Sequence, residues 1–172
     1  LNWSRSIDIA EAYFEGGRYD RTLAVLSKLP PTTQTGQNLY ARLLQVQAKI
    51  KQARPNSEKI GEFAQECRKI IELYHQLPSE QQKEINRANI GLLYLYLAEM
   101  NEKQGQRQQA EKNYAELTML LPDSAEYWYR RGKNLVAMER IAQAEYYLMQ
   151  ACKLSKKLSL PDYYLALAEV QI

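Results

Sequence analysis

Few residues of this chain could perform acid-base or metal chemistry. His75 is the single histidine among 172 residues, and it falls near the end of an expected helix. A positive charge is favoured there by the helix dipole, so we interpret His75 as a helix-end residue rather than a catalytic base. One histidine and two cysteines are too few for a zinc site. The sequence therefore predicts no metal and no cofactor.

The two cysteines and the glycines give no better evidence of catalysis. Cys67 and Cys152 lack CxxC spacing and fall on separate expected helices, which favours two buried thiols over a redox pair or a metal site. A disulfide between those helices stays open. No GxxxxGK or GxGxxG phosphate-binding motif occurs, and Gly16-Gly17 is typical of a turn. We predict that the chain is not an enzyme.

Composition restricts the class of partner. The 23 basic and 20 acidic residues leave a formal charge of only +3, which does not argue for nucleic acid. The sequence contains neither a long apolar run nor a signal peptide, so we expect no membrane insertion; a cytoplasmic or a periplasmic location fits. Because the sequence begins at Leu1 and stops at Ile172 inside an apolar run, we expect a piece of a longer protein.

Apolar residues recur at spacings of three and four along almost the whole chain, which predicts helices. Glycines and prolines predict the breaks, at Gly16-Gly17, Pro30-Pro31, Arg54-Pro55, Gly105 and Pro122. Ser79 and Gln82 are expected to form a capping box at the start of one long helix to residue 104. The expected organisation is one domain, with helix pairs over about 2–30, 36–78, 79–122 and 124–157 and a half pair over 161–172.

A repeat runs through this helical pattern. Residues 94–99 read YLYLAE and residues 164–169 read YLALAE, an offset of 70 residues. Between them Trp128 falls 34 residues after Tyr94, and Gly132 takes the place of Ala98. Two units of about 35 residues explain these spacings. The chain is therefore expected to repeat one supersecondary unit.

The repeated positions resemble the tetratricopeptide repeat (TPR) family. The third pair carries its pattern of large, small and aromatic residues at Tyr94, Leu97, Ala98, Gly105, Ala110, Tyr114 and Pro122, and the fourth pair matches it at Trp128, Gly132, Ala144, Leu148 and Ala151. The chain departs from it where Thr22 replaces an alanine, Glu139 a turn glycine and Lys156 the closing proline. The resemblance implies an all-α fold: a right-handed α-solenoid of about nine helices in antiparallel pairs, forming a TPR-like superhelix.

The resemblance also implies a function. TPR arrays bind a peptide or a partner protein on a concave face lined by the first helix of each pair, as non-catalytic scaffolds or adaptors. The residues at those positions are Asn38, Arg42, Gln45, Lys49, Leu95, Tyr96, Glu99, Glu102, Tyr129, Arg130 and Lys133. One subset of the family grips a carboxylate with lysines and asparagines. Here Ile7 and Glu11 stand at the corresponding first-pair positions, so we expect no such clamp.

Three further hypotheses remain. The array could be the sensory or regulatory segment of a larger transcription regulator or of an envelope or secretion protein. A helical-repeat RNA binder would use basic residues with Trp128 or Tyr129 as stacking platforms, but interleaved glutamates disfavour it. Those basic residues are Arg130, Arg131, Lys133, Arg140, Lys153, Lys156 and Lys157.

The last expected helix is apolar at Tyr163, Leu165, Leu167, Val170 and Ile172. This pattern predicts a covering partner, which would come from missing sequence or from another chain, including self-association.

Overall fold

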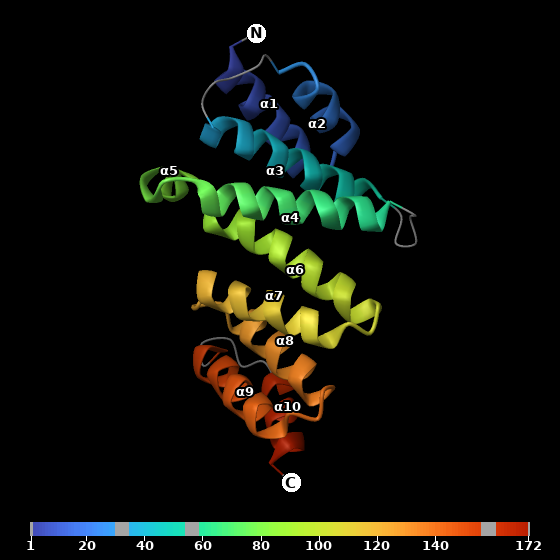
Figure 1. Ribbon diagram of the computed structural model, residues 1–172, viewed down its shortest axis with the longest axis vertical. Coiled ribbons are helices and arrows are strands. Elements are labelled where there is room, and N and C mark those ends of the chain that lie inside the picture. The colour runs from blue at the N-terminus through green and yellow to red at the C-terminus, as the bar shows by residue number, and fades with distance from the viewer. Residues whose placement is uncertain (1, 30–34, 54–58, 156–160, 172) are drawn as a thin grey trace. The chain divides into compact units, whose positions relative to one another are not determined.

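The computed structural model describes residues 2–29, 35–53, 59–155 and 161–171, and in this part of the chain every regular element is a helix (Figure 1). The ten helices are α1 (Trp3–Glu15), α2 (Tyr19–Leu26), α3 (Thr35–Gln52), α4 (Ile60–Gln76), α5 (Ser79–Glu84), α6 (Arg87–Lys103), α7 (Arg107–Leu120), α8 (Ala125–Val136), α9 (Ile141–Ser155) and α10 (Pro161–Val170). The expected all-α fold is confirmed. Pro30-Pro31, Arg54-Pro55 and Lys156 lie outside the described residues.

The chain divides into two compact units, Leu1–Leu93 and Tyr94–Ile172, with the boundary inside α6. In the first unit α1 contacts α2, α2 contacts α3 and α3 contacts α4; in the second unit α7 contacts α8, α8 contacts α9 and α9 contacts α10. First helices of successive pairs also meet, α1 with α3 and α8 with α10. Contacts limited to neighbours in the chain are typical of helical repeats. A single domain over all residues stays a prediction.

Three of the turns between helices share one hydrogen-bonded motif. Gly17, Gly105 and Glu139 have positive φ angles of 70°, 72° and 59°. The N–H of the residue after each of them donates to the carbonyl five residues earlier, as from Gln106 to Asn101. This is the Schellman motif, which ends a helix with one left-handed residue. The turns predicted at Gly17 and Gly105 are confirmed. Glu139 adopts the left-handed conformation that a glycine would adopt at the same position of the repeat.

The expected long helix over 79–104 is wrong, because the structure divides it into α5 and α6. Ile85 is extended, with φ −92° and ψ 125°, and its side chain is buried. Asn86 Oδ1 then accepts a hydrogen bond of 2.9 Å from the Ala88 amide, which caps a new helix. The predicted capping box is also wrong: Ser79 caps nothing, and Gln82 Nε2 donates to the Leu77 carbonyl instead.

Small residues allow close helix contacts in both units. In the first unit Thr22 is fully buried against α1, and its hydroxyl donates to the carbonyls of Ala10 and Arg18 at 3.3 and 3.2 Å. The hydroxyl that departs from the family pattern is therefore satisfied. In the second unit a Cβ at Gly132 would lie 2.7 Å from the Leu148 side chain on α9. Only glycine permits that approach without a shift of α9.

Candidate functional site

A row of polar side chains crosses α6, α8 and α10 in the second unit. Arg130 of α8 lies at its centre, with Nη1 2.5 Å from Glu99 Oε1 on α6 and Nε 2.6 Å from Glu126 Oε1 on its own helix. The other oxygen of Glu126 accepts a hydrogen bond of 2.8 Å from the hydroxyl of Tyr163 on α10. We call Glu99, Arg130, Glu126 and Tyr163 the polar row. It joins the first helices of three successive repeats.

A second tyrosine, Tyr129, extends the polar row. Tyr129 of α8 stacks on Tyr163 of α10, with ring centroids 4.5 Å apart and an interplanar angle of 29°. The Lys133 ammonium lies 5.5 Å from the Tyr129 ring centroid, within range of a cation–π interaction. Tyr129 is half-buried and Lys133 is exposed. This edge of the row therefore offers solvent an aromatic surface beside a positive charge.

Neighbouring groups shift the pKa values of two members of the row, Arg130 and Tyr163. Burial lowers the pKa of the Arg130 guanidinium, but the hydrogen bond to Glu126 and the charges of Glu126 and Glu99 outweigh it, so the net pKa is raised. Burial, followed by the hydrogen bond to Glu126, raises the pKa of the Tyr163 phenol. Arg130 thus stays cationic and Tyr163 stays protonated at neutral pH. Both groups therefore act as hydrogen-bond donors within the row.

The structure brings some of the predicted binding residues of the second unit together. Glu99, Tyr129, Arg130 and Lys133 all belong to the polar row or its aromatic edge. Leu95 and Tyr96 are half-buried on α6. Glu102 instead faces its own helix pair. Its Oε2 accepts a 2.9 Å hydrogen bond from Tyr114 of α7, and its Oε1 lies 3.6 Å from Arg107.

The predicted residues of the first unit lie along α3. Asn38 and Arg42 are exposed, and Gln45 is half-buried. Lys49 is oriented toward α4, where its Nζ lies 2.9 Å from Glu66 Oε1. This ion pair borders a hollow of about 520 Å³ lined from α2, α3 and α4. As for the carboxylate clamp, Ile7 is buried and Glu11 accepts a hydrogen bond from Tyr40, so neither residue offers a positive group to a ligand.

Sequence reasoning missed two members of the polar row. Glu126 precedes Arg130 by four residues on α8, a spacing that places opposite charges side by side on a helix and could have indicated the pair. Tyr163 was interpreted only as part of an apolar helix. Its hydroxyl partner lies 37 residues away in sequence, so no local pattern could have identified it.

Two of the basic residues of the RNA hypothesis, Arg130 and Arg131, form ion pairs within the protein itself. Arg131 is mostly buried, with Nη2 2.8 Å from Glu111 Oε1 and Nη1 3.0 Å from the Thr118 hydroxyl. Its guanidinium carbon lies 3.9 Å from the centroid of the Tyr147 ring, which in turn stacks on Trp128. Arg130 is held by two glutamates. Lys156 and Lys157 lie outside the described residues. Lys133, Arg140 and Lys153 are exposed, so the described part of the patch keeps three of its cations at the surface.

The side chains considered for covalent or metal chemistry are the two cysteines and His75. Cys67 and Cys152 are free and buried, as predicted, and burial raises the pKa of the Cys67 thiol to about 12. His75 is exposed in the last turn of α4, with its ring edge-on to Tyr74. In the part of the chain that the structure describes, no three His, Cys, Asp or Glu residues gather as a metal site would need. Nor does any described helix combine the length and apolarity that crossing a bilayer requires.

Comparison with known proteins identifies the fold. No protein-family model and no curated protein sequence matches the chain. Among solved structures, the MamA RS-1 ArsTM double mutant matches with a TM-score of 0.60 at 11% identity, over 98% of this chain and 94% of its own. A Podosopora anserina putative kinesin light chain with nearly identical TPR-like repeats also has a TM-score of 0.60, at 12% identity, over 97% of this chain and 84% of its own.

A third structure extends this likeness. BtubC (BKLC) from P. vanneervenii has a TM-score of 0.51 at 16% identity, and the match covers 99% of this chain but 63% of BtubC. At these identities the likeness shows the fold alone. The chain accordingly has a TPR-like, all-α helical-repeat fold, as the spacing of its small and aromatic residues predicted.

Proposed function

We propose that this chain is a non-catalytic scaffold or adaptor, which binds an extended peptide or a helix of a partner protein along the polar row of its second unit. The observation that carries the proposal is the row itself. Successive first helices place ion pairs, a tyrosine hydroxyl and the Tyr129–Tyr163 stack in one connected, partly exposed array. Tyrosine and arginine are enriched among the residues that dominate binding energy at interfaces.

The rigidity of the row supports this function. Arg130 is held from two sides and Tyr163 is anchored to Glu126, so these side chains lose little conformational freedom when a ligand binds. A peptide backbone laid across the row would meet carboxylate acceptors, a guanidinium donor and the partly exposed ring of Tyr129. Such a mixed surface gives specificity through matched hydrogen bonds and affinity through the rings.

The fixed protonation states support binding rather than catalysis. A general acid or base needs a pKa near the working pH, whereas the shifts at Arg130 and Tyr163 move both groups away from neutrality. The ion pairs of Arg130 and Arg131 also disfavour the RNA hypothesis, because phosphate binding needs available cations. A partner protein is the class of ligand that this surface suits best.

The test is quantitative affinity capture followed by titration of the captured partner. The variant Tyr96→Ala, Tyr129→Ala and Arg130→Ala is compared with wild type and with a control, Tyr146→Ala, which removes an exposed tyrosine on α9. We expect at least one partner that the control retains and the triple variant loses by tenfold or more, with helicity unchanged by circular dichroism. Equal capture by all three proteins would remove the polar row from the binding site.

A salt series distinguishes peptide binding from the RNA hypothesis. Peptide recognition through the row should weaken only modestly between 50 and about 200 mM salt, whereas an RNA complex loses affinity steeply as counterions return. Captured RNA whose binding falls by two orders of magnitude over that range would overturn the proposal in favour of RNA binding.

A further inference from the structure

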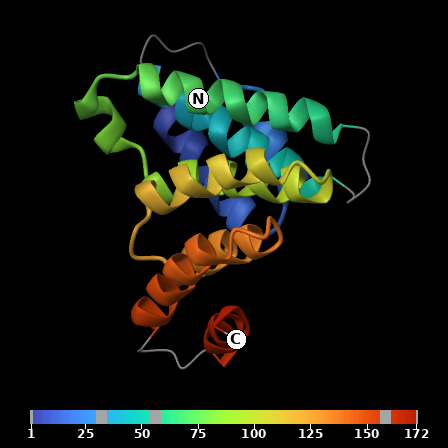
Figure 2. The same cartoon turned by 60° about the horizontal axis from the view of Figure 1, so that its bottom comes forward.

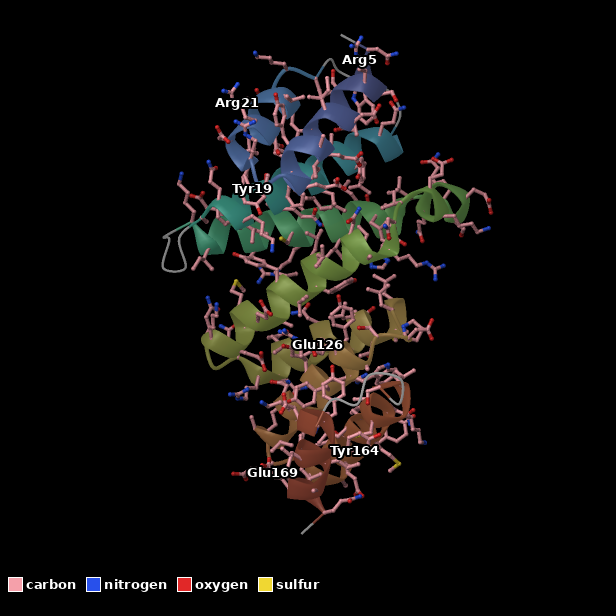
Figure 3. All side chains as sticks on the ribbon, turned by 180° about the vertical axis from the view of Figure 1, so that it is seen from behind. Arg5, Tyr19, Arg21, Glu126, Tyr164 and Glu169 are labelled. Carbon is pink, nitrogen blue, oxygen red and sulfur yellow. The ribbon has the colours of Figure 1, made fainter. Side chains whose placement is uncertain are left out.

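A hollow in the first unit, which we call the α4 hollow, is built from three helices. It has a volume of about 520 Å³, and its lining from α2, α3 and α4 includes Leu23, Lys49, Gln52, Glu62, Phe63 and Glu66. Figure 2 shows α4 lying along α3, as in Figure 1, and α2 also contacts α3. Figure 3 gives the reverse view, with Tyr19 and Arg21 labelled on α2. The volume falls within the roughly 300–1,000 Å³ of typical ligand pockets.

Part of the lining of the α4 hollow is apolar. Phe63 of α4 is 8% exposed, and Leu23 of α2 is half-buried. Both side chains line the hollow and come from the second helices of successive pairs. An aliphatic chain laid against them would withdraw apolar surface from water, which favours binding.

The α4 side of the hollow carries two carboxylates. Glu62 and Glu66 are four residues apart, a spacing that places side chains next to each other on one helix face. Lys49 Nζ lies 2.9 and 3.1 Å from the two oxygens of Glu66, so these two charges compensate each other. Lys59 also lines the hollow and has a partner of its own. Glu62 is exposed and forms an ion pair with none of the described residues, so the uncompensated charge on this wall is negative.

A guanidinium group matches these carboxylates. Each oxygen of Glu66 accepts from Lys49 but keeps further acceptor capacity, because a carboxylate has about four lone-pair sites. The planar fork of arginine carries several donors and can reach Glu62 and Glu66 together, whereas a lysine ammonium acts as a point charge. An anionic ligand would instead meet the like charge of Glu62.

The α4 hollow is also open enough to admit a side chain from outside. The side chains of Lys49 and Glu66, which form its ion pair, are 32% and 39% exposed. Gln52 of α3 is exposed as well, and its amide can both donate to and accept from a peptide main chain. These features fit one side chain of a polypeptide, with its main chain at the rim.

We propose that the α4 hollow binds an arginine side chain of a partner polypeptide. The guanidinium pairs with Glu62 and Glu66, and the aliphatic stem packs on Leu23 and Phe63. Gln52 hydrogen-bonds the main chain on either side of the arginine. The hollow belongs to the first unit and shares no residue with the polar row, so each site can be tested without the other.

The test uses blocked peptides with a central arginine between glycines, and twins with citrulline or lysine in its place. Citrulline keeps the length and shape of arginine but is neutral. Binding to the full chain is measured by NMR titration. We expect the arginine peptide to bind about tenfold more tightly than the citrulline twin and more tightly than the lysine twin. Glu62→Gln should raise its Kd about tenfold, and Leu23→Ala about threefold.

A matched control and a free guanidine complete the test. Glu72→Gln removes an exposed carboxylate of α4 that does not line the hollow, and it should leave the Kd unchanged. The proposal is overturned if roughly 10 mM arginine peptide gives no shift, if the citrulline twin binds as tightly, or if Glu62→Gln binds unchanged. Agmatine carries the guanidinium without a peptide main chain. If it binds as tightly as the arginine peptide and Gln52→Ala weakens neither, the site belongs to a small amine and the proposal also fails.

Discussion

In each unit a polar side-chain contact links two helices, but the chemistry of that contact differs between the units. In the first unit, a hydrogen bond from the Tyr40 hydroxyl to the Glu11 carboxylate links α3 to α1, and both residues are half-buried. In the second unit, the ion pair of Arg131 and Glu111 links α8 to α7, with both side chains almost fully buried. The first link is a hydrogen bond at a partly wet site, whereas the second holds two opposite charges out of water.

This difference predicts how much stability each unit loses when one partner of its contact is removed. A buried ion pair adds little net stability, yet losing one partner leaves an uncompensated buried charge. Glu111 Oε2 is already buried without a hydrogen-bond partner among the described side chains, so the site has no spare donor. We therefore expect the second unit to tolerate changes at its link far less well than the first.

The largest effect is expected for Arg131→Ala. Removing the guanidinium leaves Glu111 buried and charged, so the free energy of unfolding should fall by about 3–5 kcal/mol. Tyr40→Phe, the matched change in the first unit, removes one hydrogen bond and should cost about 1 kcal/mol. Urea unfolding measures both, with hydrogen exchange to locate the loss. Equal losses would contradict the comparison, and Arg131→Met with Glu111→Leu should restore most of the stability.

Gly132→Ala should have the next largest effect. The added Cβ would lie 2.7 Å from Leu148 Cγ and Cδ2 and 3.3 Å from its backbone nitrogen, which cannot rotate away. Overpacking of this kind costs about 1–3 kcal/mol. The control in the first unit is Gly61→Ala in α4, where a Cβ would meet nothing within 4 Å and helix stability should rise by about 0.5 kcal/mol. Thermal melts that move both variants in the same direction would contradict this prediction.

The turns predict changes of opposite sign in the two units. Glu139 adopts a φ of 59°, a left-handed conformation that strains a residue with a Cβ, so Glu139→Gly should stabilise the second unit by about 1 kcal/mol. Gly17, with a φ of 70°, closes the first pair by the same motif, and Gly17→Ala should destabilise it by a similar amount. Denaturant midpoints measure both changes. A loss of stability in Glu139→Gly would show that the carboxylate makes a compensating contact.

The last stability prediction concerns the two thiols and applies only above pH 9. Burial, with a smaller contribution from the Glu66 charge, raises the pKa of Cys67 to about 12, above its ordinary value of 9.0. The folded state therefore keeps the proton that the unfolded chain loses, and the free energy of unfolding should fall as pH rises from 9 toward 12. Cys67→Ala should flatten that slope relative to wild type. Burial raises the pKa of Cys152 as well.

A thiol reagent separates the two cysteines at a single pH. Cys152 retains slight exposure, whereas Cys67 is fully buried. At pH 8 the native protein should react slowly at Cys152 and more slowly still at Cys67, and both should react at once in urea. Faster labelling of Cys67 would mean that the first unit opens more readily than the second.

Local spacing in the sequence determined most of the helices. Gly17 and Gly105 close their turns as expected, because helical periodicity and left-handed glycine depend on residues only a few positions apart. The division of the chain between α5 and α6 was missed. There the burial of Ile85, a tertiary effect, outweighs a run of good helix formers.

Tertiary structure decided which side chains of the candidate site contact one another. The sequence placed Glu99, Tyr129 and Arg130 at positions that the TPR resemblance assigns to binding. It did not indicate that Arg130 would pair with a glutamate 31 residues earlier, or that Tyr163 would donate to Glu126 across 37 residues. Such pairs form only where packing brings distant helices within hydrogen-bond distance and excludes enough water to favour one geometry. Sequence thus determined where each side chain lies on its helix, and packing determined which side chains it meets.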